Sequence, residues 1–194
     1  DYDKVYKMCY IDAPKYGNDI DEVDLMVRRV NNSILHAFES VDGGGNYISK
    51  NMKTSLDQYT KSIHNLMGMV TGALPTGKKA GVALTDGSLS AMPGTDVNGA
   101  TALINSAAKA NDATKWCATH MNLKLPPEQL KTRKGRESMM NLVRTLFQNG
   151  GYHIQFNVLD TEMLRDAQKH PEKYRDLVVR VAGFSAFFTK LHVG

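Results

Sequence analysis

Residues 180–188 read Arg180-Val181-Ala182-Gly183-Phe184-Ser185-Ala186-Phe187-Phe188, which places a glycine inside an apolar segment with no evident turn to make. Glycine in a strand or a buried loop adds no side-chain packing and loses more backbone entropy on folding than other residues. It therefore marks a bulge, a bend or a close approach by another group, or it serves a chemical purpose. One such purpose is open only to glycine: loss of a hydrogen atom from its Cα leaves a planar carbon radical that no Cβ obstructs.

Four further stretches occur in the chain order of one known family. They are Asp12–Asp19, Gly72–Gly81, Pro93–Asp96 and Gly151–Asn157, which read DAPKYGND, GALPTGKKAG, PGTD and GYHIQFN. With residues 180–188 they resemble the landmarks of the glycyl radical enzymes, the family of pyruvate formate-lyase and its dehydratase, decarboxylase and lyase relatives. A motif is a hypothesis until its context agrees, and this resemblance covers nearly the whole chain. It implies that Gly183 is the catalytic radical site.

The resemblance also implies a fold. We expect an α/β protein that forms the C-terminal part of a ten-stranded α/β barrel, with the glycyl radical loop inserted towards the barrel centre. Residues 1–149 are expected to be the C-terminal part of the catalytic barrel domain. Residues 150–194 are expected to form the glycyl radical domain, incomplete at its C-terminus.

In this family a radical S-adenosylmethionine activase removes the glycine hydrogen, and the radical later passes to a cysteine that takes hydrogen from the substrate. Counting back from Gly183 places that cysteine before residue 1, and neither Cys9 nor Cys117 matches it. Both read as packed residues. We therefore expect a fragment of a larger enzyme, inactive alone, with no bound cofactor and no metal site.

The substrate is a finer question. The amino-acid sequences of Ser88–Ala102 and of the loop at Phe184 resemble those of the fumarate-adding branch, the alkylsuccinate and benzylsuccinate synthases. These enzymes join an alkane or alkylbenzene to fumarate during anaerobic hydrocarbon degradation. Two alternatives stay open: a diol dehydratase or C–N lyase acting on a small polar substrate, and a stand-alone spare glycyl radical subunit. Small accessory subunits and a homo-oligomer of the full-length chain are further expectations.

Composition excludes several other classes. The 194 residues are 42% hydrophobic, with a formal net charge of +4, and no window approaches the roughly 18 consecutive apolar residues of a membrane span. The N-terminus lacks the layout of a signal peptide, so a cytoplasmic protein is expected. The basic run Lys131–Arg136 lacks the interleaved aromatic residues of a nucleic-acid platform. We expect no nucleic-acid and no membrane partner.

Hydrophobic periodicity places the regular elements. It predicts helices over 21–39, 101–109 and 137–148, a short helix that begins at Asp160 or Thr161 and ends at His170-Pro171, and strands over 152–158 and 177–181. The first helix is expected to bury Val23, Met26, Val27, Val30, Ile34 and Phe38. Residues 72–99, rich in Gly, Pro, Ser, Thr and Asp, are expected to form a long ordered loop.

The strand over 152–158 has one apolar and one polar face. His153, Gln155 and Asn157 share the polar face, which fits a half-exposed antiparallel strand or a barrel strand that turns polar groups inward. The resemblance favours the barrel. We interpret His153 as a hydrogen-bonded strand residue in preference to a base paired with Asp96. Gln155 and Asn157 are candidates for hydrogen bonds to a substrate or to the glycine loop.

Overall fold

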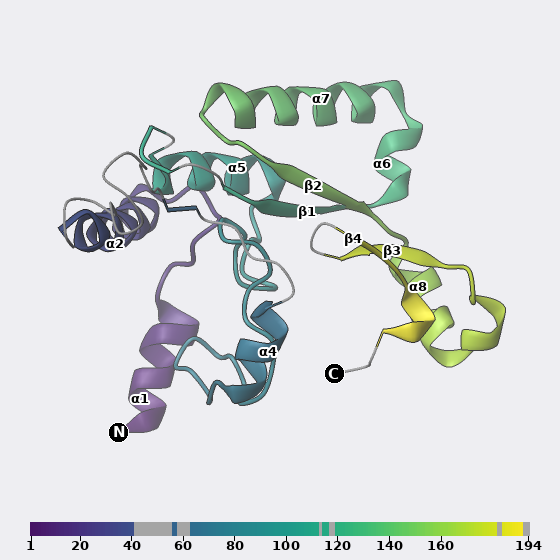
Figure 1. Cartoon of the computed structure of the whole chain (residues 1–194), viewed down its shortest axis with the longest axis horizontal. Coiled ribbons are helices and arrows are strands. Elements are labelled where there is room, and N and C mark those ends of the chain that lie inside the picture. The colour runs from purple at the N-terminus through teal and green to yellow at the C-terminus, as the bar shows by residue number, and fades with distance from the viewer. Residues whose placement is uncertain (41–55, 58–62, 113, 117–118, 182–183, 192–194) are drawn as a thin grey trace, which may run out of the picture.

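The computed structural model describes residues 1–40, 56–57, 63–112, 114–116, 119–181 and 184–191. Figure 1 shows helices above a two-stranded parallel sheet and an antiparallel hairpin below the end of that sheet. In chain order the elements are α1 (Tyr2–Tyr6), the π-helical η1 (Lys7–Asp12), α2 (Asp21–Ser40), α4 (Ile63–Val70), α5 (Gly99–Ala110), β1 (Met121–Leu125), α6 (Pro127–Lys131), α7 (Arg133–Gln148), β2 (Ile154–Val158), α8 (Thr161–Lys169), η2 (Pro171–Lys173), β3 (Val178–Val181), β4 (Phe184–Phe187) and η3 (Phe188–Lys190).

The parallel sheet lies at the centre of the described structure. β1 pairs with β2 from Met121 opposite Ile154 to Leu125 opposite Val158. Parallel strands need a crossover connection, and α6 with α7 supplies it. The pairing joins residues on both sides of the expected boundary between 149 and 150. That boundary itself stays a prediction.

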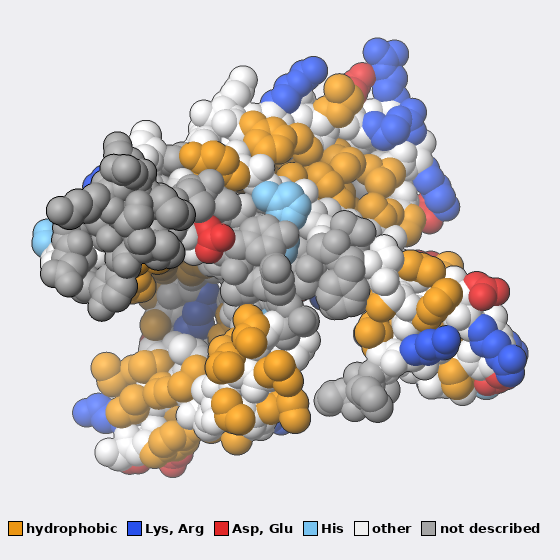
Figure 2. Space-filling model, in the orientation of Figure 1, with side chains coloured by type: hydrophobic (Ala, Val, Ile, Leu, Met, Phe, Trp, Pro, Cys, Tyr) orange, Lys and Arg blue, Asp and Glu red, His pale blue; other side chains and the backbone are white. Residues whose placement is uncertain are grey.

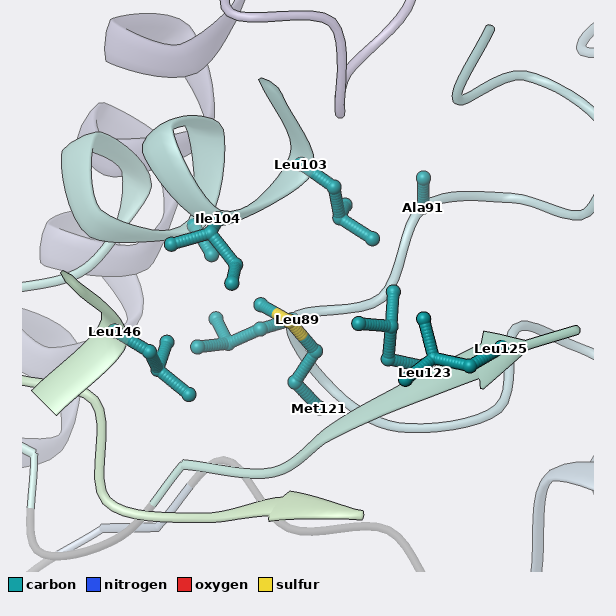
Figure 3. Packing of buried hydrophobic residues seen from close by; sticks show 9 residues of the cluster. Leu89, Ala91, Leu103, Ile104, Met121, Leu123, Leu125 and Leu146 are labelled. Atoms are coloured by element: carbon teal, nitrogen blue, oxygen red, sulfur yellow. The ribbon is translucent and has the colours of Figure 1, made fainter. Parts of the chain in front are cut away.

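The hydrophobic core fills the space between this sheet and the helices. Figure 3 shows Leu103 and Ile104 of α5 turned towards Met121 and Leu123 of β1, with Leu146 of α7 at one side. The loop residues Leu89 and Ala91 complete the cluster. One face of the sheet is thus closed by helices, which leaves its other face for other contacts.

The long loop before α5 is ordered, as predicted. It carries no helix or strand between Thr71 and Asn98, and Leu89 N donates a hydrogen bond to His120 O across 3.1 Å. Gly17, with φ +96°, brings the N-terminal segment against this loop, because a Cβ at that position would lie 2.8 Å from the Ala91 Cβ. Only glycine combines that backbone angle with so close an approach.

Most predicted elements are confirmed, but their buried faces are not always those expected. Helix α2 buries Asp24 and Leu35, whereas Met26, Val30 and Ile34 are about half exposed. In α7, Leu146 is buried while Met140 and Phe147 are exposed. Periodicity identifies an apolar face but not what covers it, so the expectation that α2 buries those three residues is wrong for this chain. Strand β1 and the short helices α1 and α6 were not predicted.

Candidate functional site: the C-terminal hairpin and the polar face of the parallel sheet

Strands β3 and β4 form an antiparallel hairpin around the predicted radical site. Val178 pairs with Phe187, and Val181 pairs with Phe184. The extended segment predicted over 177–181 is thereby confirmed. Gly183 falls in the chain between the last paired residues of the two strands, and with Ala182 it lies outside the described residues. Its role as the radical carrier stays a prediction.

The surroundings of the hairpin are mixed. Val179 is buried and Phe188 is half-buried. Phe187, in the apolar segment that contains Gly183, is 41% exposed. The ammonium of Lys190 lies 5.1 Å from the centroid of the Phe187 ring, a distance at which a cation is attracted to the ring face.

Helix α8 and η2 anchor the hairpin at its open end. The Asp160 side chain caps α8 by accepting hydrogen bonds from the backbone N–H of Glu162 and of Met163, as the sequence predicted. Phe188 N donates to Leu177 O across 2.7 Å, which closes the hairpin. The Tyr174 hydroxyl donates to Asp166 Oδ2 across 2.7 Å. This hydrogen bond lowers the pKa of the Asp166 carboxyl and raises the pKa of Tyr174.

The face of the parallel sheet away from the helices is polar. On β2, Gln155 and Asn157 are buried, confirming the predicted alternation, and they stand beside Asn122 and Lys124 of β1 in the strand register. The parallel pairing with β1 favours the predicted barrel strand over the half-exposed antiparallel alternative. Strand β1 shows the same alternation, with Met121, Leu123 and Leu125 against Asn122 and Lys124, but it was not predicted.

Two histidines continue this polar face at the start of the strands. The rings of His120 and His153 lie 4.7 Å apart between centroids, tilted by 32°. His120 is fully buried, and His153 is half-buried. His153 comes directly before β2 and packs against another imidazole. Its interpretation as a hydrogen-bonded strand residue stays a prediction.

A charged cluster that the sequence did not reveal joins α2 to α5. Asp24 is fully buried and accepts a hydrogen bond from the Ser106 hydroxyl across 3.0 Å. Lys109 Nζ lies 2.5 Å from carboxylate oxygens of both Asp19 and Asp21, and 3.9 Å from Asp24 Oδ2. Burial raises the pKa of Asp24, while hydrogen bonds from Lys109 and Asn105 lower the pKa of Asp19.

Hydrogen bonds of Asn18 hold the first family landmark next to this cluster. Asn18 Nδ2 donates to Thr95 O across 2.7 Å, and Asn98 N donates to Asn18 Oδ1 across 3.0 Å. The stretches Asp12–Asp19 and Pro93–Asp96, far apart in the sequence, therefore lie against each other. The structure brings two of the quoted stretches together near α5.

On the helical side, a cleft of about 560 Å³ lies between the start of α5, the end of β1, α6 and α7. Figure 2 shows apolar side chains over this region with lysines and arginines at its rim. Within the described ranges, no group of three His, Cys, Asp or Glu side chains is arranged to hold a metal ion. In those same ranges, no helix combines the length and the apolar character that crossing a membrane requires.

Similar proteins agree with the resemblance. Indoleacetate decarboxylase of Tractidigestivibacter scatoligenes is 43% identical over 183 residues, which cover 93% of this chain and 20% of the relative. The 4-hydroxyphenylacetate decarboxylase glycyl radical subunit of Clostridioides difficile is 40% identical over 199 residues, covering 98% and 20%. The chain thus spans about a fifth of the length of these relatives. The named relatives do not support the finer likeness to alkylsuccinate and benzylsuccinate synthases.

A solved structure gives the same assignment. The glycerol-bound form of the B12-independent glycerol dehydratase from Clostridium butyricum superposes with a TM-score of 0.85 at 38% identity, over 98% of this chain and 23% of the dehydratase. Residues 85–189, which include Gly183, match the family described as "Glycine radical". The chain therefore belongs to the glycyl radical enzyme family, and it has the α/β fold of the C-terminal part of such an enzyme.

Proposed function

We propose that this chain is the C-terminal part of the catalytic subunit of a glycyl radical decarboxylase or dehydratase, and that it stores the radical on Gly183. The observation that carries the proposal is the family match over residues 85–189, which includes this glycine. The paired strands on either side of Gly183 support it. The pairing of β3 with β4 holds the backbone on both sides of the glycine. Glycine has no Cβ to shield its Cα.

The proposed chemistry has four hydrogen-atom transfers. An activase removes one hydrogen atom from the Cα of Gly183. A cysteine of the full-length subunit then gives its S–H hydrogen to that carbon, which restores the glycine and leaves a sulfur radical. The sulfur radical takes a hydrogen atom from the substrate, and after rearrangement the product radical takes it back. No electron or proton is lost over the cycle.

Two observations favour a polar substrate over a hydrocarbon. The relatives named above act, by their names, on indoleacetate, 4-hydroxyphenylacetate and glycerol. The sheet face turned away from α5 and α7 carries amides, imidazoles and a lysine. Hydrocarbons are bound by apolar walls, since unpaired polar groups lose hydrogen bonds to water. These observations support the dehydratase alternative and its decarboxylase counterpart better than fumarate addition.

The test uses the full-length protein, activated under strict anaerobiosis with its radical S-adenosylmethionine activase. Activated enzyme is given, one at a time, indoleacetate, 4-hydroxyphenylacetate, glycerol, and labelled fumarate with toluene, and products are identified by mass spectrometry. Loss of CO2 from an acid, or of water from glycerol, is the expected result. A labelled substituted succinate would overturn the proposed substrate class in favour of fumarate addition.

Partners and location complete the proposal. The activase is the required partner, and the glycyl radical is the species that it installs. The named C. difficile relative is described as one subunit, which supports the expectation of an accessory subunit. A homo-oligomer and a cytoplasmic location remain expectations. Gel filtration of the anaerobically purified full-length protein measures the first.

A further inference from the structure

The basic run Lys131–Arg136 borders the cleft of about 560 Å³ on the helical side of the sheet. We call this cleft the α6–α7 groove, and the start of α5 and the end of β1 complete its lining. Much of its wall is aliphatic, with side chains of Leu125, Leu130, Met139 and Leu142. In Figure 2 apolar side chains are visible over this region, and lysines and arginines lie at its rim. The groove thus combines an apolar wall with a basic rim.

The groove is open to solvent, and its apolar wall is only partly covered. Leu125 is buried, whereas Leu130, Met139 and Leu142 are half-buried. In an α/β barrel the crossover helices form the outer layer, so the helical side of the sheet faces away from the barrel centre. The fold of this chain therefore turns the groove towards the outside of the subunit, where another molecule can reach it.

The corner between α6 and α7 holds the groove in one shape. The Thr132 hydroxyl accepts a hydrogen bond from Gly135 N across 3.0 Å. Arg136 Nη1 donates to Leu130 O across 2.9 Å. A Cβ added at Gly135 would lie 1.6 Å from Gln129 O, so the two helices are in close contact there. A groove that is already formed loses less free energy when a partner binds.

The rim of the groove carries unbalanced positive charge. Residues 127–148 contain five lysines and arginines but only two glutamates. Both glutamates are already paired, one with Lys131 and the other with Arg133. Lys134 lines the groove and is exposed, and it has no ion-pair partner among the residues that the structure describes. A ligand that carries carboxylates beside an apolar surface would match this rim.

We propose that the α6–α7 groove docks an acidic amphipathic helix of a second polypeptide, the accessory subunit. The proposal rests on the proposed function, to whose accessory subunit it gives a docking place and a chemistry. When a helix binds in a groove, the apolar residues along one of its faces fill the groove. Acidic residues at the edges of that face would then meet Lys134 and its basic neighbours.

Three other occupants match the groove less well. A small molecule is enclosed over most of its surface by its pocket, whereas this groove is open. A second copy that presented the same groove would bring two basic rims together, and like charges repel. A membrane surface takes up apolar side chains that protrude into it, whereas the apolar side chains here line a recess.

The first experiment asks whether the groove is free in the full-length catalytic subunit purified alone. Ser138 is exposed and lines the groove, and Asn141 is exposed on α7 outside it. Ser138→Cys and its matched control Asn141→Cys are treated with a maleimide, and labelling at each site is measured by peptide mass spectrometry. Both variants are expected to react. A protected Ser138→Cys would show that the subunit's own chain covers the groove and would overturn the proposal.

The second experiment measures, by fluorescence anisotropy, binding of a labelled synthetic peptide to the same protein. The peptide is a helix of leucine and glutamate with the leucines along one face. One control peptide has the same composition in scrambled order, and another has lysine in place of glutamate. Only the acidic amphipathic helix is expected to bind. Lys134→Glu should raise its Kd roughly threefold to tenfold, whereas Lys169→Glu, at an exposed lysine of α8, should leave the Kd unchanged.

The proposal is overturned if the acidic helix does not bind, if all three peptides bind equally, or if Lys134→Glu leaves the Kd unchanged. Binding to vesicles of phosphatidylserine and phosphatidylcholine in place of the peptide would assign the groove to a membrane surface. Neither experiment needs a radical, so the two proposals fail separately. If activated enzyme turns over its substrate but no acidic helix binds, only the docking groove fails. If the helix binds but no glycyl radical forms, only the proposed function fails.

Discussion

The two sheets of this chain differ in how their strands are held. β1 and β2 are parallel, span five pairs and are closed on one face by α5 and α7. β3 and β4 are antiparallel, span four pairs and bury Val179 while Val178 and Phe187 remain exposed. Packing against distant helices therefore holds the first sheet in place. The second sheet is held chiefly by the hydrogen bonds between β3 and β4 and by the neighbouring α8 and η2.

This difference separates two tasks within one catalytic subunit. The packed sheet holds its polar residues in a constant position, because α5 and α7 close its other face. The hairpin holds the backbone on both sides of Gly183 chiefly by its own strand pairing. The proposed function places the radical on the less packed of the two sheets.

The largest expected effect comes from the hairpin. Gly183→Ala should abolish the radical completely in activated full-length protein, because a Cβ shields the Cα and crowds the planar radical. Circular dichroism and gel filtration should match the wild type. Gly72→Ala, at an exposed glycine of the long loop where an added Cβ meets nothing within 4 Å, is the control and should keep the radical. Full radical yield in Gly183→Ala would show that another residue carries the radical.

The next effect tests the packing of the two sheets. Met121→Ala removes a fully buried side chain from β1 and should destabilise the protein by about 2–5 kcal/mol. Val178→Ala removes a side chain from β3 that is 48% exposed and should cost less than about 1 kcal/mol. The denaturant midpoint of the full-length protein measures both. Equal costs would mean that the hairpin is packed as tightly as the parallel sheet.

A smaller, pH-dependent effect on stability is expected at the charged cluster that joins α2 to α5. Lys109→Met removes the cation that lowers the pKa of Asp19. The same cation lowers the pKa of Asp24, against the rise that burial causes. Because the folded-state pKa of Asp19 lies below its ordinary value of 3.8, its contribution to stability is present above that pH and is lost as the pH falls through the lowered pKa.

The denaturant midpoint of Lys109→Met should therefore fall below that of the wild type at pH 7, and the gap should narrow at pH 3. Lys131→Met, which removes an exposed ion pair with Glu128, should leave the midpoint unchanged. A difference in midpoint that widens in acid would contradict stabilisation of the ionised Asp19 carboxylate by Lys109.

The smallest effect concerns the anchor of the hairpin. Tyr174→Phe removes the hydrogen bond to Asp166 and should speed amide hydrogen exchange in peptides from residues 174–181 at pH 7. Peptides from β1 should exchange at the wild-type rate, because they lie in a separately packed sheet. Measurement by mass spectrometry suits a protein of this family's length. Faster exchange in both sheets would show that they are coupled.

The sequence predicts some features of this fold well and others poorly, for physical reasons. Asp160 caps α8 as predicted, since a cap depends on residues two or three positions away. Asp24 reads in sequence as a solvated helix residue, because its burial depends on Ser106, 82 positions along the chain. β1 was missed although Met121, Leu123 and Leu125 alternate with Asn122 and Lys124, because so short a run gives periodicity little to distinguish a strand from other structure. The pairing with β2 makes the strand evident.

Electron paramagnetic resonance of activated full-length protein tests most directly whether Gly183 carries the radical. The α-hydrogen that remains on a glycyl radical splits the signal into a doublet. If Gly183 is the carrier, glycine deuterated at Cα collapses the doublet to a single line, and Gly183→Ala removes the signal. A signal that neither deuterated glycine nor Gly183→Ala alters would place the radical on another residue.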